Sequence, residues 1–275
     1  MPDARTDAER LAGYVDAWWA AVQDFTDLVA SLSADDWSRP TDLPGWDVKA
    51  VVSHVAHLEA LLGGAPHEHA DVPDAEHIRG PMGQFTEIGV LTRREEAPAE
   101  IVEQIRRYTT VRHDALLADP PTDPSAPAPG VFGAIGWSVG LLLRNRPLDV
   151  WMHEQDVRRA VGRPGGLDSA GAEHTTDYLL ESLGLVLAKR AGAASGCTLV
   201  VLVDGSAPTA YGVGEDGRGH RLDAPPAEPT ATLRMSRETF IRLAGGRGGV
   251  DTDAIAVDGD VPLGEKVVAH LAVTP

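Results

Sequence analysis

The hydrophobic pattern of the chain changes once, near residues 163–168, where helical periodicity gives way to a mixture of shorter runs. Before that point, apolar residues recur at helical spacing in long segments that Pro- and Gly-containing stretches separate. Four such segments joined by loops predict a four-helix bundle. The segments cover residues 7–32, 48–62, 98–118 and a stretch that ends at Val161.

Local signals define some boundaries of this bundle and leave others open. Asp47 is the residue type that commonly caps a helix N-terminus, and Gly63 and Gly64 end the same segment. Pro147 either starts the fourth helix or kinks a longer helix that begins near Ile135. Residues 65–85 contain several Pro and His residues and are predicted to form a loop.

The second half of the chain predicts a small α+β domain. Strand-like apolar runs alternate there with helical stretches, after one further helix over residues 168–191. The expected strands cover 197–204, 209–214, 231–236 and 254–259, and the expected helices cover 236–245 and 263–272. The predicted fold class is therefore α plus α+β, with a helical bundle over 1–165 and an α+β domain over 166–275.

Composition excludes several classes of function. The 275 residues carry a formal net charge of −17, which argues against binding to nucleic-acid phosphates. The single cysteine, Cys197, rules out an intrachain disulfide and a zinc site made of several thiolates. No apolar run reaches the length of a membrane span, and the N-terminus lacks an apolar signal core. We expect a cytoplasmic monomer or homodimer without membrane or nucleic-acid partners.

The second helical segment directs one histidine inward. Val51, Val55 and Leu58 mark the centre of its apolar face. At about 100° per residue, His54 lies roughly 60° from that centre, inside a core-facing stripe. His57 lies about 60° further round, so we expect it at the rim or on the surface.

The stretch DVWMHEQDVRRAVGRP, residues 149–164, places four metal-capable side chains on the fourth helix. The same arithmetic puts His153 on the buried side and Asp149, four residues earlier, at its edge. Asp156 lies about 20° beyond Asp149, where it can hold a neighbouring histidine in one tautomer. Glu154 projects about 100° away from His153 and is predicted to be a surface group.

His54, Asp149 and His153 together form a candidate metal site. Two imidazoles and a carboxylate suit zinc first, with nickel, manganese or iron(II) as alternatives, and three protein ligands leave positions for water or substrate. From the spacing alone, two simpler readings stay open. The inward histidine would be a hydrogen-bonded core residue, or Asp149 and His153 would simply bond to each other.

Three motifs carry a resemblance to a known family. They are LPGWDVKAVVSHVAHLE, DVWMHEQDVRRAVGRP, and the C-terminal pair ATLRMSRETFIRLAGGR and AIAVDGDVPLGEKVVAHLAVTP. In this order they resemble the mycothiol-dependent maleylpyruvate isomerase family, which joins a DinB-like metal-binding bundle to a sterol-carrier-like α+β domain. The resemblance implies a divalent metal held by His54, Asp149 and His153. At one of these positions the chain differs from the isomerase, which has glutamate in place of Asp149.

The resemblance further implies that the chain is a metalloenzyme and that mycothiol is its cosubstrate. A cationic metal favours thiolate over thiol, so it makes a nucleophile from an external thiol without a protein cysteine. The expected function is a thiol transferase or isomerase acting on a small electrophilic substrate. Two rivals are a metal hydrolase that uses bound water with Asp156 or Glu154 as base, and a non-catalytic protein that binds a small ligand.

Other residues have weaker functional readings. Arg247, in the Gly-rich LAGGRGG turn, is a candidate substrate-binding residue, with a structural ion pair as the alternative. Trp46 and Trp137 either line a pocket or pack beside helix starts.

Overall fold

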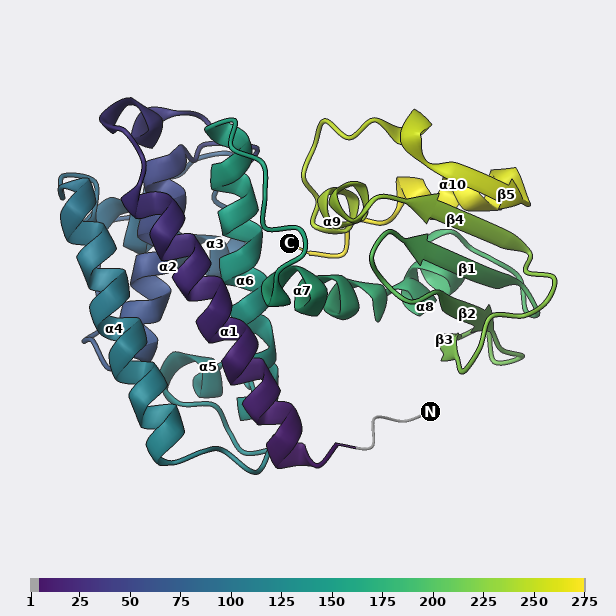
Figure 1. Ribbon diagram of the computed structural model, residues 1–275, viewed down its shortest axis with the longest axis horizontal. Helices are drawn as coiled ribbons and strands as arrows, with labels where there is room; N and C mark the ends of the chain where they lie inside the picture. Colours follow the sequence, from purple (N-terminus) through teal and green to yellow (C-terminus); the bar gives the residue numbers. More distant parts are fainter. Residues whose placement is uncertain (1–4, 275) are drawn as a thin grey trace. The chain divides into compact units, whose positions relative to one another are not determined.

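The structure is a computed structural model that describes residues 5–274. The chain divides into two compact units, one over Asp3–Gly171 and one that includes Ala172–Pro275. Figure 1 shows helices in the first unit and a sheet with helices in the second, which confirms the predicted fold class. The domain boundary after residue 165 stays a prediction.

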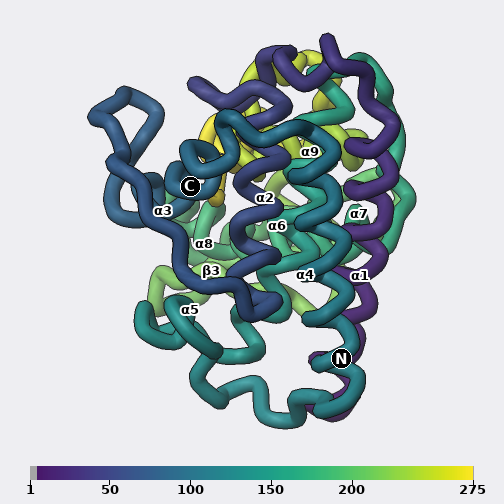
Figure 2. Tube along the Cα trace, turned by 90° about the vertical axis from the view of Figure 1, so that its left-hand side faces the viewer, coloured from purple at the N-terminus to yellow at the C-terminus, as the bar shows by residue number. Residues whose placement is uncertain are grey.

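Four long helices form the first unit. Figure 2 shows α2 beside α4 and α4 beside α1, and α6 contacts both α1 and α2. Buried apolar residues such as Trp18, Val55, Ile105 and Trp151 fill the space between them. The long helices are α1 (Asp7–Ala30), α2 (Val48–Leu62), α4 (Pro98–Ala118) and α6 (Val139–Ala160).

Of the two alternatives for the fourth helix, the longer helix is the correct one, although it starts later than expected. Ser138 caps α6 by accepting a hydrogen bond from the amide of Leu141, and Pro147 lies inside the continuous helix. Residues near Ile135 belong instead to a turn after a short helix, α5 (Gly130–Ala134). A short 3₁₀ helix, η1 (Ala34–Ser38), follows α1.

The prediction of a loop over residues 65–85 is wrong at its C-terminal end. Helix α3 (Gly80–Thr92) begins there and packs against α2. Its sequence contains three glycines and a proline, and so gives little helical signal. Gly89 allows the close approach, because a Cβ at that position would lie 2.3 Å from the Cβ of His57.

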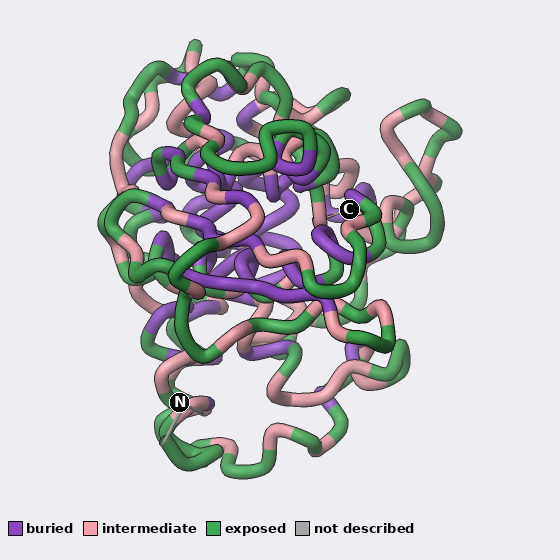
Figure 3. Tube along the Cα trace, turned by 90° about the vertical axis from the view of Figure 1, so that its right-hand side faces the viewer, coloured by how far each residue is buried: buried purple, intermediate pink, exposed green. Residues whose placement is uncertain are grey.

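The second unit is built on one five-stranded sheet in the order β3-β2-β1-β4-β5. β1 pairs in parallel with β4, and the other neighbouring pairs are antiparallel. Figure 3 shows exposed connections around buried stretches of this unit. The strands are β1 (Thr198–Val203), β2 (Thr209–Val213), β3 (Gly219–Leu222), β4 (Ala231–Met235) and β5 (Ala256–Gly259).

Helices follow and precede these strands largely as predicted. The expected helix over 168–191 is broken into three pieces, and a fifth strand, β3, was not predicted. Helices α8, η2 and α10 contact the sheet. The helical elements are α7 (Ala170–Leu180), α8 (Leu183–Leu185), the π-helical turn η2 (Val186–Arg190), α9 (Arg237–Ala244), the 3₁₀ turn η3 (Thr252–Ala254) and α10 (Val261–Ala269).

Over residues 5–274, no helix has both the length and the apolar character required to span a membrane.

A fully buried carboxylate, that of Glu59 on α2, ties the four long helices together. Its Oε1 accepts hydrogen bonds from Trp18 Nε1 at 3.1 Å and from Arg146 Nη2 at 2.7 Å. Its Oε2 accepts one from Arg112 Nη1 at 3.2 Å, and the Arg112 guanidinium lies 4.5 Å from the centre of the Trp18 ring. The partners come from α1, α4 and α6, so one carboxylate connects all four helices.

We predict that Glu59→Ala destabilises the helical unit by about 3–5 kcal/mol, because it leaves buried Arg112 without its counter-charge and leaves Arg146 with Asp149 alone. The measurement is the free energy of unfolding in urea. Glu103→Ala is the matched control, since Glu103 is exposed on α4 and its loss should change stability by less than about 0.5 kcal/mol. Equal effects of the two substitutions would contradict a structural role for the buried carboxylate.

Two glycines of α3 should respond oppositely to alanine. Gly89→Ala places a methyl group against His57 and should destabilise the unit by about 1–3 kcal/mol. At Gly83 the nearest atom would lie 3.4 Å from the new Cβ, so alanine should stabilise the helix by up to about 1 kcal/mol. Thermal unfolding of both variants checks the prediction, and a stable Gly89→Ala protein would contradict the packing of α3 on α2.

Candidate metal centre

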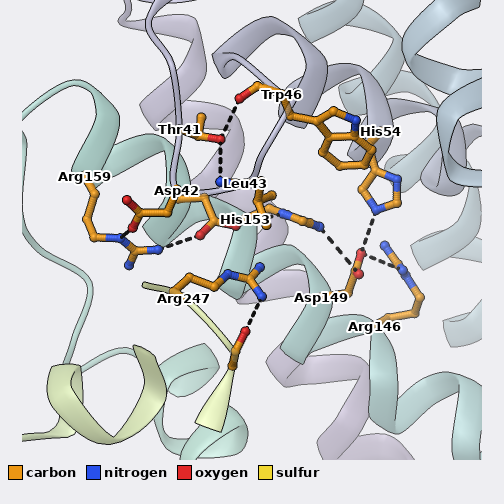
Figure 4. A network of polar contacts seen from close by, with 12 residues as sticks. Thr41, Asp42, Leu43, Trp46, His54, Arg146, Asp149, His153, Arg159 and Arg247 are labelled. Atoms are coloured by element: carbon orange, nitrogen blue, oxygen red, sulfur yellow. Dashed lines mark hydrogen bonds and ion pairs between the residues drawn. The ribbon is translucent and has the colours of Figure 1, made fainter. Parts of the chain in front are cut away.

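Three side chains predicted as metal ligands converge between α2 and α6. His54, Asp149 and His153 each present one ligand atom, and these atoms lie within 4.8 Å of one another. Asp149 Oδ2 lies 3.8 Å from His54 Nε2, and Asp149 Oδ1 lies 3.7 Å from His153 Nε2 (Figure 4). The structure therefore brings all three together, while their role as ligands stays a prediction.

The local sequence explains this convergence. Asp47 caps α2 by accepting from the amide of Ala50, and the helix then carries His54 two turns into the bundle. Asp149 and His153 are four residues apart on α6, so their side chains project from neighbouring turns of one face. α2 and α6 pack against each other, so the histidines of the two helices meet where the helices are in contact.

The spacing of the three ligand atoms fits a bound divalent ion. Distances of 3.7 and 3.8 Å are too long for direct hydrogen bonds. Ligands about 2.1 Å from a tetrahedral zinc lie roughly 3.4 Å apart. The two distances from Asp149 to the histidines exceed that spacing by a few tenths of an ångström, and all three ligand atoms lie within 4.8 Å of one another.

His54 is prepared to act as a neutral ligand. Burial lowers the pKa of its ring to about 4, against the opposing effect of Asp149. The neutral imidazole keeps a lone pair, which is the form that binds metals. Within residues 5–274, its Nδ1 is buried and has no hydrogen-bond partner, and its Nε2 has no carboxylate within bonding distance. A ligand role for Nε2 gives this ring the partner that it otherwise lacks.

Arg146, which the sequence analysis did not single out, fixes the carboxylate of Asp149. Its Nη1 donates to Asp149 Oδ2 at 2.9 Å, while its Nε and Nη2 donate to Glu59. Burial would raise the pKa of Asp149, but Arg146 and the two histidines outweigh it and hold that pKa well below the usual range. Arg146 lies three residues before Asp149, and an arginine at that spacing from a candidate ligand is a signal available in the sequence.

Asp156 lies against the second histidine, and its role in fixing one tautomer stays a prediction. Its Oδ2 lies 3.1 Å from His153 Nδ1, and its Oδ1 accepts from Arg159 Nη2 at 2.5 Å. Because this fully buried carboxylate also pairs with Arg159, its ionised form would accept the hydrogen bond, and His153 Nδ1 would donate it. That tautomer leaves the lone pair of His153 Nε2 directed towards the candidate centre.

An indole ring lies against both histidines. The ring centre of Trp46 is 5.1 Å from that of His54 and 6.3 Å from that of His153. Trp46 Nε1 donates to Glu87 Oε2 at 2.9 Å, and Glu87 is a buried residue of α3. Glu87 escaped the sequence analysis because α3 itself did.

Two orientations predicted from the helix wheel are wrong. His57 is buried, with α3 covering it, and its Nδ1 lies 2.9 Å from Glu68 Oε2. Glu154 is fully buried and accepts from Arg158 Nε at 2.6 Å, close to Gly166 of the segment after α6. In both cases an element outside the long helices covers a face that the wheel assigns to solvent.

The remaining candidates lie away from these ligands in sequence. Trp137 packs against Phe132 with ring centres 5.3 Å apart, as part of an apolar cluster. Arg247 follows α9 in the second unit, where its Nη1 donates to the carbonyl of Gly245 at 2.6 Å. Its substrate-binding role stays a prediction. Cys197 is a half-buried free thiol just before β1.

Comparison with solved structures supports this architecture. A crystal structure of the mycothiol-dependent maleylpyruvate isomerase matches with a TM-score of 0.55 and 19% identity, covering 92% of this chain and 95% of that one. A mutant of that enzyme with a histidine replaced by alanine matches with a TM-score of 0.52, with the same identity and coverage. At this level of identity, the likeness shows the fold.

Curated relatives match about half of the sequence. Two uncharacterized proteins of Mycobacterium tuberculosis, from strains CDC 1551 / Oshkosh and H37Rv, are each 28% identical over 145 residues. These matches cover 52% of this chain and 54% of each relative.

Two family models match successive parts of the chain. The mycothiol maleylpyruvate isomerase N-terminal domain matches residues 18–158, which include His54, Asp149 and His153. The corresponding C-terminal domain matches residues 173–266. Together they cover most of both compact units, and the chain belongs to the mycothiol maleylpyruvate isomerase family.

Proposed function

We propose that this chain is a metal-dependent enzyme that joins a low-molecular-weight thiol, mycothiol or a relative of it, to a small electrophile. The observation that carries the proposal is the convergence of His54, Asp149 and His153 inside a chain of this family. The thiol and the electrophile are its proposed partners.

His54, Asp149 and His153 would hold the metal, with zinc as the first candidate. When bound, a divalent cation stabilises the thiolate form of a thiol and so supplies a nucleophile at neutral pH. The residues around the site have separate tasks. Arg146 orients Asp149, and Asp156 keeps the proton of His153 on Nδ1, away from the ligand atom.

The nucleophile is proposed to come from outside the protein. Cys197, the chain's one cysteine, belongs to the second unit and is not among the residues that converge on the candidate centre. In the reaction, the thiol loses its proton and its sulfur adds to an electrophilic carbon of a conjugated double bond, whose electron pair moves onto the acceptor group and takes up a proton. Retention of the carbon–sulfur bond gives a transfer product, whereas rotation and loss of the thiol give an isomer. We favour transfer, because thiol addition is the step that both outcomes share.

We predict that the purified protein binds one zinc or nickel ion per chain and that His54→Ala abolishes this stoichiometric binding. Asp156→Asn should weaken the metal affinity by about 10- to 100-fold, because it disturbs the hydrogen bond that orients His153. Metal analysis and competition with a chromogenic chelator measure both effects.

His69→Ala is the control for metal binding, since His69 lies exposed in the loop between α2 and α3. It should bind metal as the unsubstituted protein does. The proposed function would be contradicted if His54→Ala still bound metal stoichiometrically, or if the unsubstituted protein bound no metal.

We also predict that consumption of a reactive electrophile requires mycothiol and metal together. The assay follows free thiol by a colorimetric reagent while a panel of electrophiles is supplied, with glutathione as the comparison thiol. Chelation should stop the reaction, and added zinc or nickel should restore it.

The two rival functions give different outcomes in this assay. Electrophile consumption that persists without any thiol indicates a metal hydrolase. A metal-loaded protein that is inert towards the whole panel, but whose thermal stability rises with a ligand in the absence of thiol, indicates a binding protein.

A further inference from the structure

Trp46 stands where the candidate metal centre meets the surface. His54 and His153 are buried, whereas Trp46 and Asp149 are each partly exposed. The indole contacts both imidazole rings, which are themselves arranged edge to face with centres 4.9 Å apart (Figure 4). The three rings form one packed cluster, so the indole occupies space directly beside the ligands.

Glu87 fixes the indole by its polar edge. Its Oε2 accepts the indole N–H at 2.9 Å, and only 5% of the residue is exposed. A buried carboxylate that accepts a hydrogen bond from a ring edge restricts rotation of that ring. His77, in the segment before α3, has its Nε2 3.6 Å from the same oxygen.

The segment that carries Trp46 is itself held at both ends. Pro40 and Asp47 form an antiparallel bridge, and Thr41 Oγ1 donates to the carbonyl of Trp46 at 2.8 Å. Arg159 Nε on α6 donates to Asp42 Oδ2 at 2.6 Å. The segment is therefore attached to the helix that carries two of the candidate ligands.

Gly45 gives this segment its close fit. Its φ of +82° is a conformation that L side chains rarely adopt. A Cβ there would also lie 2.5 Å from Nδ1 of the His77 ring. The turn that delivers Trp46 thus depends on a residue without a side chain.

We propose that Trp46 is a specificity-determining residue that forms an aromatic wall beside the candidate centre, and that Glu87 is its positioning residue. The wall limits the bulk of any group that approaches the ligand atoms on that side. This inference rests on the proposed function, because it assumes a metal held by His54, Asp149 and His153. It also assigns a role to α3, which contributes no ligand.

The test uses the full-length protein loaded with cobalt(II), whose visible absorption reports ligand exchange. Two probe thiols of different bulk, 2-mercaptoethanol and benzyl mercaptan, are titrated into each variant. The readout is the ratio of their dissociation constants. Trp46→Ala should shift this ratio about tenfold in favour of benzyl mercaptan, and Trp46→Phe should shift it less.

Variants of Glu87 separate positioning from packing. Glu87→Gln keeps an oxygen that accepts the indole N–H, so it should retain the ratio of the unsubstituted protein. Glu87→Leu removes the acceptor and should shift the ratio in the same direction as Trp46→Ala. Trp137→Phe is the matched control, because Trp137 packs in the cluster around Phe132, and it should leave the ratio unchanged.

The outcomes distinguish a failure of this inference from a failure of the proposed function. An unchanged or reversed ratio in a Trp46→Ala protein that binds cobalt overturns the aromatic wall and leaves the proposed function standing. Equal ratios for Glu87→Gln and Glu87→Leu overturn the positioning role of Glu87. Failure of the unsubstituted protein to bind cobalt overturns the proposed function together with this inference. If the alanine variant does not fold, the ratio of dissociation constants is compared between Trp46→Phe, which preserves an aromatic ring, and the unsubstituted protein.

Discussion

The buried carboxylate of Glu59 is the interaction on which both the helical unit and its candidate metal centre depend. It accepts hydrogen bonds from Trp18, Arg112 and Arg146, and so joins α1, α2, α4 and α6 through one charged group. A charge in the protein interior is tolerated only when it is paired and hydrogen-bonded. Arg146 then extends the network to Asp149, so the guanidinium that pairs with the buried Glu59 also orients a candidate ligand.

Charged groups of both signs lie beside the candidate centre. Glu59 and Asp149 supply two negative charges, and Arg112 and Arg146 supply two positive charges. These four charges cancel one another without a metal. A divalent cation at this place would leave a positive excess, which an anionic ligand such as a thiolate would neutralise. The chain's overall negative charge does not alter this local preference.

Helical periodicity was sufficient to select His54, Asp149 and His153, because each lies on a face that packs against another long helix. It failed for His57 and Glu154, since short elements cover those residues: α3 for the first and the segment after α6 for the second. α3 shows only a weak helical pattern, because the glycines that permit its close packing also lower helical propensity, and the segment after α6 forms no helix. β1, β2 and β4 were predicted from apolar runs that are largely buried, and β5 from a short run that is mostly exposed. β3 was missed because its two central residues are polar and exposed.

The resemblance to the isomerase family included one departure, an aspartate at position 149 in place of glutamate, and the structure offers a physical reason for it. Arg146 reaches Asp149 Oδ2 at 2.9 Å while Oδ1 faces His153 Nε2. A glutamate would extend the carboxylate by about 1.5 Å. The guanidinium has little freedom to retreat, because Glu59 holds it at 2.7 Å inside the core. The shorter carboxylate and the buried arginine are therefore matched, and lengthening Asp149 alone would displace either its bond to Arg146 or its approach to His153.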